Sequence, residues 1–217
     1  GSWRTGNSLN TARIYASGAG TATAALAVGG ETPSPAIVGN TELYDGTSWT
    51  EVNDLNTART TGGSGGATNT AAIYWGGTTP PVVANVETWN GTNWTEVNDL
   101  NTARRSMPGG GGTSTSTLAF GGESPGSAQL AVTELWNGTN WTEVNDLNDA
   151  REYLGGDGTD NTSALAVGGN TPGVTGNTET WNGTNWTEVN NLNTARQSLG
   201  ASGISTAMVV YGGYTTT

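Results

Sequence analysis

Apolar residues in this chain occur in two kinds of short segment that alternate along the sequence. One kind is a continuous apolar run closed by two glycines, as in Ala71–Gly77, and the other alternates apolar and polar positions, as in Val86–Val97. Continuous runs of this length are typical of buried strands, and strict alternation is typical of strands with one buried face. No segment keeps the 3.6-residue period of a helix, so the pattern predicts an all-β protein.

These segments recur with a fixed period. The string WNGTNWTEVNDLNTAR begins at Trp89, near-copies begin at Tyr44, Trp136 and Trp181, and a shorter version opens the chain at Ser2. The arginines that end the copies are 46, 45, 47 and 45 residues apart, and a Gly-Gly pair follows the same period. A period in this range is typical of a repeat architecture in which each copy is one structural unit.

One repeat, residues 59–104, predicts four strands. The third and fourth strands lie on either side of a polar turn in which the pair Gly91-Thr92, glycine first, fits a type II′ hairpin. In this register Trp89 faces Trp94, and Asn-Gly as the turn pair is the alternative. Four strands per repeat, repeated about five times, predict small sheets stacked radially in a β-propeller.

The sequence therefore predicts a single domain over residues 1–217, a five-bladed β-propeller of four-stranded antiparallel blades. The last blade is composite: the chain ends after the strand Val209–Gly213 and begins on the strand Trp3–Gly6, and we expect this N-terminal strand to close the blade within one molecule. The alternative is an unpaired edge that takes a strand from another subunit, which would build a homo-oligomer, a ring or a filament.

The order of these motifs resembles the kelch repeat family. Its pattern is matched by Gly76-Gly77, by Glu87-x-Trp89, by Trp94 and by Arg104, with equivalents through nearly the whole chain. The near-identity of the copies is similar to repetitive kelch-like proteins of phages and environmental bacteria. Two features depart from the family pattern: a spacing of five residues between the aromatic residue and the tryptophan, and the missing histidine after the arginine. The resemblance implies a propeller of four-stranded blades and a binding scaffold, and no enzymatic activity.

Residues that recur in every copy are assigned to the scaffold, because every copy needs them to fold. We expect a buried or half-buried Glu–Arg pair in each blade, and a functional arginine cluster like that of sialidases is the alternative. Asp45 in the first turn is assigned to hairpin chemistry, because the other copies carry Asn there. The scaffold positions are Arg13, Arg59, Arg104, Arg151, Arg196, Glu42, Glu87, Glu134, Glu179, Trp49, Trp94, Trp141 and Trp186.

Composition narrows the function. The formal charge is −11, and all seven basic residues are arginines, so we expect no nucleic-acid partner. No segment reaches 18 apolar residues, so we expect no membrane insertion. The chain contains no histidine, cysteine or lysine, and we predict no enzyme and no cofactor, with a glycosidase-like carboxylate pair as an alternative. Asp157, Asp160 and Asn161 could offer oxygens to calcium, but a glycine-rich turn explains them as well, and we predict no metal site.

The copies differ most in the loops between the second and third strands and in the residues that follow each arginine. In an up-and-down blade these two connections share one face, and loops on a rigid scaffold are where binding usually resides. We therefore predict a recognition or adhesion module for a glycan or protein on a cell or virion surface. A purely structural fibre, ring or shell subunit is the alternative, and simple drift between copies also explains the variation. The candidate ligand-binding residues are Tyr15, Arg105, Met107, Glu152, Tyr153 and Gln197.

Overall fold

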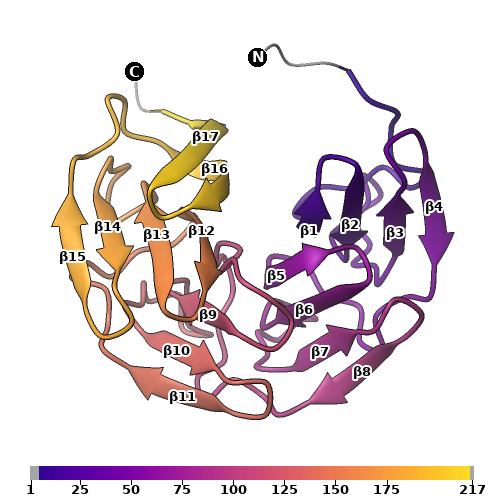
Figure 1. The fold of residues 1–217 in the computed structure, drawn as a ribbon, viewed down its shortest axis with the longest axis horizontal. Helices are drawn as coiled ribbons and strands as arrows, with labels where there is room; N and C mark the ends of the chain where they lie inside the picture. Colours follow the sequence, from indigo (N-terminus) through magenta and orange to yellow (C-terminus); the bar gives the residue numbers. More distant parts are fainter. Residues whose placement is uncertain (1–4, 216–217) are drawn as a thin grey trace.

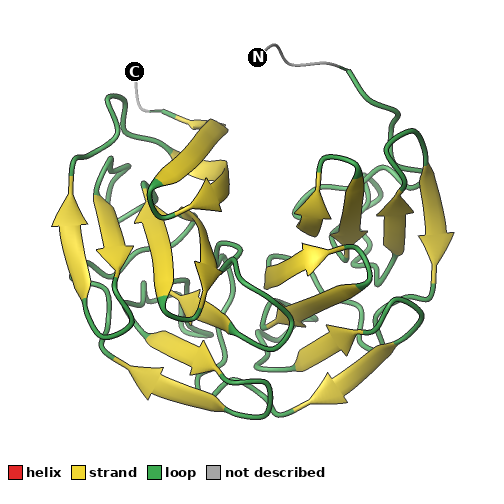
Figure 2. Cartoon of the chain, viewed as in Figure 1, coloured by secondary structure: helices red, strands yellow, loops and turns green. Residues whose placement is uncertain are grey.

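The computed structural model describes residues 5–215, and every regular element in these residues is a β-strand (Figure 2). The strands form consecutive antiparallel sheets arranged around a central axis, with one strand of a sheet near the axis and another at the periphery (Figure 1). The all-β, propeller-like prediction is confirmed. The first sheet contains β1 (Ser17–Thr21), β2 (Ala24–Val28), β3 (Thr41–Tyr44) and β4 (Trp49–Val52).

The remaining sheets follow in chain order. The second contains β5 (Gly63–Thr68), β6 (Ala71–Trp75), β7 (Val86–Trp89) and β8 (Trp94–Val97). The third contains β9 (Thr117–Phe120), β10 (Thr133–Trp136) and β11 (Trp141–Val144). The fourth contains β12 (Gly155–Asp160), β13 (Ser163–Val167), β14 (Thr178–Trp181) and β15 (Trp186–Val189). The last contains β16 (Gln197–Ile204) and β17 (Ala207–Tyr214).

The structure thus has four blades and a two-stranded hairpin, and the prediction of five four-stranded blades is wrong in this respect. The third blade lacks its innermost strand, because the sequence there is Pro108 followed by four glycines. Proline has no N–H for a ladder, and Gly111 and Gly112 have positive φ angles of 65° and 84°. This segment bonds instead to the neighbouring inner strands, through Gly110 N–H to Ser64 O and through Gly112 N–H to Gly158 O.

The predicted closure of the last blade by the N-terminal strand is also not observed. Trp3 and Arg4 lie outside the described residues, and Thr5 and Gly6 are not in a strand. The segment that follows runs along the first sheet: the Asn7 side chain donates to Thr47 O at 2.7 Å, and Trp49 Nε1 donates to Asn7 O at 3.1 Å. These bonds hold the segment against the first blade, and no bridge joins it to β17 within residues 5–215.

The predicted hairpin register is confirmed. Trp89 lies opposite Trp94 with ring centroids 5.4 Å apart, and Gly91 has a positive φ of 92°. Asn90 does not have a positive φ, which excludes the alternative Asn-Gly type I′ turn. The Asn90 side-chain oxygen accepts the backbone N–H groups of Thr92 and Asn93 at 2.9 Å each, so an Asx interaction reinforces the turn.

The core lies between adjacent sheets. One cluster joins Ile73 and Trp75 of the second sheet to Trp136 and Trp141 of the third, and equivalent clusters join the first sheet to the second and the third to the fourth. Trp94 of the second sheet donates its indole N–H to Thr41 Oγ1 of the first at 2.9 Å. Trp94, Trp141 and Trp186 therefore join blades, as expected of large aromatic residues.

Candidate functional site

The face that carries the loops between the second and third strands and the residues after each repeated arginine is called the variable face here. It contains one repeated cross-strand pair in each unit. The residue directly after each repeated arginine lies opposite the residue directly after the Gly-Gly pair of the same unit. In the first four units the two residues form an isolated antiparallel β-bridge, and in the last unit they are paired residues of β16 and β17. In the first four units a residue of the following loop extends the pairing to a third position. The paired residues are Ile14 and Glu31, Thr60 and Thr78, Arg105 and Glu123, Glu152 and Asn170, and Gln197 and Tyr214.

The next residue of each unit has a left-handed backbone. Tyr15, Thr61, Ser106, Tyr153 and Ser198 have φ between 52° and 59°, although none of them is glycine. We call these five residues the stations. From the second station on, the backbone N–H of each station donates to the C=O of the station before it, at 3.4, 2.9, 3.0 and 2.7 Å in chain order. A strained conformation that recurs five times is held by its surroundings, so the stations form a rigid arc at this face.

A cavity of about 620 Å³ opens at this face and is lined by residues of the first four units. It contains three of the predicted site residues, Tyr15, Arg105 and Tyr153, which are far apart in the sequence. The second unit contributes threonine hydroxyls, and the first contributes a carboxylate. The other lining residues are Glu31, Pro35, Ile37, Thr60, Thr61, Thr78, Thr79, Pro80 and Ser106. Two aromatic rings beside a guanidinium, a carboxylate and hydroxyls form a mixed apolar and polar surface.

Charges at the edge of this cavity are largely paired. Arg105 holds Glu123 through two parallel hydrogen bonds, Nε to Oε2 at 3.0 Å and Nη2 to Oε1 at 2.9 Å. The Arg105 guanidinium therefore keeps the pKa of Glu123 below its ordinary value. Burial, together with the neighbouring Glu123 carboxylate, raises the pKa of Glu152, whose Oε1 accepts from Asn170 Nδ2 at 3.3 Å. The two glutamates thus form a carboxyl pair anchored on one side by arginine.

The other three candidate residues lie elsewhere. Met107 is 8% exposed and belongs to the core, with its sulfur accepting from Arg104 Nε at 3.3 Å, so its expected place at the mouth is wrong. Met107 lies one residue beyond the station, where alternation turns its side chain inward. Glu152 lies at the variable face beside Glu123 but does not line the cavity. Gln197 begins β16 opposite Tyr214, outside the cavity.

Three residues that line the cavity or pair with Arg105 were not predicted from the sequence: Glu31, Thr78 and Glu123. Each directly follows a Gly-Gly pair, and this position carries a different residue type in nearly every copy. The same comparison of copies that selects the residues after the arginines also selects these. From the sequence, the position after Gly-Gly is expected to belong to a long loop, so its pairing was not predicted. In the structure it pairs with the residue after the arginine.

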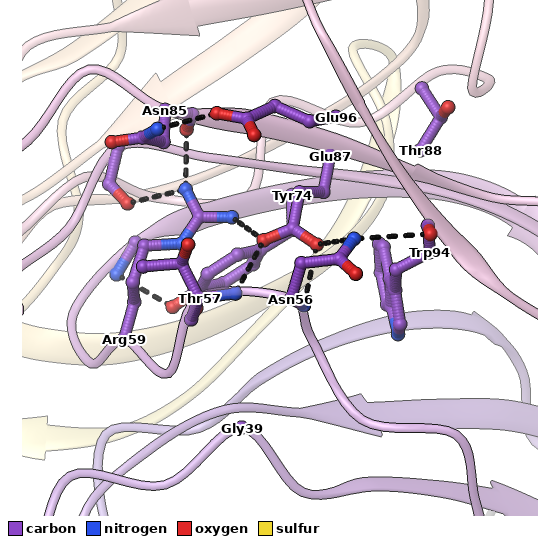
Figure 3. A network of polar contacts seen from close by, with 12 residues as sticks. Gly39, Asn56, Thr57, Arg59, Tyr74, Asn85, Glu87, Thr88, Trp94 and Glu96 are labelled. Atoms are coloured by element: carbon purple, nitrogen blue, oxygen red, sulfur yellow. Dashed lines mark hydrogen bonds and ion pairs between the residues drawn. The ribbon is translucent and has the colours of Figure 1, made fainter.

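The repeated arginines are buried scaffold, as predicted. Arg13, Arg59, Arg104 and Arg151 pair with Glu42, Glu87, Glu134 and Glu179 at 2.7–3.1 Å, and all eight side chains are at most 1% exposed. In Figure 3, Glu87 accepts from Arg59 Nη2 at 2.8 Å and from both the backbone and side-chain nitrogens of Asn56 at 2.8 Å. With no exposed surface, these arginines have no access to a ligand.

Arg196 is the exception among the repeated arginines. Its Nη1 donates to Gly212 O at 2.8 Å, much as Arg59 Nη1 donates to Gly76 O at 3.3 Å. Within residues 5–215 it has no carboxylate partner, and it is partly exposed. The third-strand glutamate that would pair with it is not present in the two-stranded sheet.

The opposite face, which carries the Asn-Gly-Thr turns, is engaged in contacts between blades. Asn53 Nδ2 donates to Thr92 O at 2.9 Å in the next blade, and Asn98 and Asn145 repeat this contact. Asp45 takes the role of the turn asparagine, and the N–H groups of Ser48 and Thr47 lower its pKa. This face is therefore structural.

The candidate calcium ligands serve the local fold. Asp157 accepts the backbone N–H groups of Gly158 and of Gly203, both at 2.8 Å, and burial raises its pKa. Asp160 accepts the N–H of Thr162 at 2.7 Å. In the part of the chain that the structure describes, no group of three or more His, Cys, Asp or Glu side chains converges as metal ligands would.

No known protein family matches this chain, and no curated protein is similar enough to count as a relative. Residues 5–215 contain no helix that is long and apolar enough to cross a membrane.

Proposed function

We propose that the chain is a non-enzymatic recognition module that binds a neutral glycan in the cavity of the variable face. The observation that carries this proposal is the convergence of Tyr15, Arg105 and Tyr153, from three different repeats, on one cavity of about 620 Å³. Aromatic rings offer flat apolar surfaces, and guanidinium, carboxylate and hydroxyl groups supply the hydrogen bonds that fix orientation in such pockets. A protein loop with similar chemistry is the second candidate ligand.

The charges favour a neutral ligand over an anion. The guanidinium of Arg105 is already held by Glu123 through two hydrogen bonds, and Glu31 adds a further carboxylate to the lining. The chain as a whole carries a formal charge of −11. A phosphorylated or otherwise anionic ligand would meet repulsion over most of this surface.

We further propose that the four blades and the hairpin form a kelch-type propeller in which β16 and β17 are the inner strands of an incomplete fifth unit. Five stations repeat with the same left-handed backbone, and four hydrogen bonds link them in series. A fifth bond, from Tyr15 N–H to Ser198 O, would close the series into a ring. A structure determined at high resolution that has four equally spaced blades would contradict this part of the proposal.

The ligand is tested by glycan-array screening, followed by variants that exchange residues between repeats. Tyr153→Ser copies the stations Ser106 and Ser198, so it removes the ring while keeping a residue that the fold accepts. The double variant Arg105→Thr/Glu123→Thr copies the Thr60 and Thr78 pair of the second blade and leaves no buried charge. Both variants should weaken binding at least about tenfold, or about 1.4 kcal/mol.

Asp45→Asn is the matched control, because it gives the exposed turn of the opposite face the residue found in the other copies. This control should bind as the parent does, and all the variants should melt at similar temperatures. Binding that survives both variable-face variants, or the absence of any glycan or protein ligand on such screens, would refute the proposal.

A further inference from the structure

Two hydroxyl groups in the lining of the cavity are buried without a hydrogen-bond partner within residues 5–215. They are Thr60 Oγ1 and Ser106 Oγ. Each residue is only 5% exposed, so neither hydroxyl is solvated as a surface hydroxyl is. A polar group that is buried without a partner destabilises a fold. The two oxygens therefore favour a partner that the chain itself does not supply.

The other threonine hydroxyls of the lining have partners within the protein. Thr61 Oγ1 donates to Thr60 O at 2.7 Å and lies 3.5 Å from Thr78 Oγ1. Thr79 Oγ1 donates to Pro81 O at 3.3 Å. Among the serine and threonine side chains that line the cavity, the two buried hydroxyls are thus a distinct, unsatisfied pair.

The repeats indicate that the scaffold does not require these two hydroxyls. The position of Thr60 carries Ile14 in the first unit, and the position of Ser106 carries Tyr153 in the fourth. Ser198 is also a serine station, but its side chain is exposed, whereas Ser106 is buried. Buried polar groups are nearly always paired within the protein, and departures from this rule are expected at functional sites.

Ser106 lies where the cavity meets the centre of the propeller. It lines the cavity and also a larger space of about 1210 Å³ that residues of the inner strands β1, β5, β12 and β16 line. Tyr15 lines both spaces as well and is 57% exposed, so its ring is available at the mouth of the cavity. The cavity therefore offers an aromatic surface at its mouth and unpaired hydroxyls at its inner end.

We propose that Thr60 and Ser106 form a hydroxyl-binding subsite, in which each side chain exchanges a hydrogen bond with a ring hydroxyl of a hexose that stacks on Tyr15. The inference rests on the proposed function, because it names the part of a neutral glycan that the cavity recognises. A serine or threonine hydroxyl is both donor and acceptor, as a sugar hydroxyl is, so the two match without any charge. Both oxygens are covered in the structure, so binding includes a rotation about χ1 that turns them to the ligand.

Deoxy sugars test the ligand side of this subsite. A site whose buried groups hydrogen-bond a ligand hydroxyl rejects the analogue that lacks it, because the protein groups are then left unpaired. The probes are the methyl glycosides of glucose, galactose and mannose and the monodeoxy derivatives of each, titrated into the full chain and followed by NMR. At least one glycoside should bind, and removal of one of its ring hydroxyls should weaken binding at least about tenfold.

Three variants test the protein side. Thr60→Val and Ser106→Ala should each weaken binding of the same glycoside at least about tenfold, and each should no longer distinguish one deoxy derivative from the intact sugar, as expected of a coupled pair. Ser198→Ala is the matched control: it makes the same change on the same left-handed backbone, at an exposed position outside the cavity, and should bind as the parent does. The melting temperature should not fall in either cavity variant, because the hydroxyl removed has no partner in the protein.

The outcomes separate this inference from the proposed function. A melting temperature that falls in Thr60→Val and Ser106→Ala but not in Ser198→Ala would make the hydroxyls structural and overturn the inference without any ligand. Glycoside binding that both cavity variants retain would overturn it as well, and so would a parent that binds array glycans but none of the methyl glycosides; both results leave the proposed function standing. A parent that binds neither array glycans nor methyl glycosides would overturn the glycan proposal and the subsite together.

Discussion

Removing one member of a buried ion pair should destabilise this protein strongly, and the repeats supply the control. Arg59→Gln leaves Glu87 buried and only 1% exposed without its counter-charge, and it also removes hydrogen bonds to Gly76 O and Asn85 O. Losing one partner of a buried pair costs about 3–5 kcal/mol. Arg196 is the equivalent residue of the last unit, and within residues 5–215 it has no carboxylate partner. Arg196→Gln removes only the hydrogen bond to Gly212 O at a partly exposed site, so it should lower the free energy of unfolding by about 1 kcal/mol.

The two free energies of unfolding should therefore differ by about 2–4 kcal/mol. Urea denaturation followed by tryptophan fluorescence measures this difference, and calorimetry should show melting temperatures lowered by about 6–20 °C for Arg59→Gln and about 2–4 °C for Arg196→Gln. Equal losses, within about 1 kcal/mol, would show that the arginines stabilise the blades through their backbone contacts and that the carboxylate contributes little.

Two further predictions concern single residues. Burial raises the pKa of Glu152 in the folded state, so above its ordinary pKa of 4.5 the ionised carboxylate destabilises the fold. Glu152→Gln should therefore raise the melting temperature near neutral pH, and the free energy of unfolding should rise by less than about 1 kcal/mol because the site is partly exposed. This gain should vanish below about pH 4, where the carboxyl is protonated in both states. An equal gain at both pH values would contradict the pKa argument. Gly29→Ala and Gly212→Ala both introduce left-handed strain, but only Gly29 also faces a backbone oxygen at 2.5 Å, so Gly29→Ala should cost on the order of 2 kcal/mol more in denaturation experiments.

Features encoded within one repeat were predictable from the sequence. The register of Trp89 and Trp94 follows from alternation and turn chemistry, and the Arg59–Glu87 pair follows from residues that always recur together. The position of Met107 was predictable in principle, because its equivalents Leu154 and Leu199 are also apolar and buried, but its variable neighbours favoured a surface position.

Closure of the last blade could not be predicted in the same way. It depends on the rotation between successive sheets, which no local pattern sets. The bond from Asn7 to Thr47 O repeats the contact that Asn53 makes with Thr92 O, so the repeat pattern explains how the N-terminal segment meets the first blade but not whether the last sheet is completed. The cavity was only partly predictable, because its lining comes from residues on different repeats whose spatial order depends on the same rotation.

The pairs of variable residues at the face have a consequence for how this protein can diversify. Each pair lies on the same backbone geometry, and the stations accept Tyr, Thr or Ser at nearly the same φ, while the ion pair beneath is unchanged in the first four units. Recombination between near-identical repeats would therefore reshuffle aromatic, acidic and basic side chains across one surface without disturbing the core. The fold separates inheritance of the scaffold from variation of this face, so a small set of repeats can generate many different surfaces.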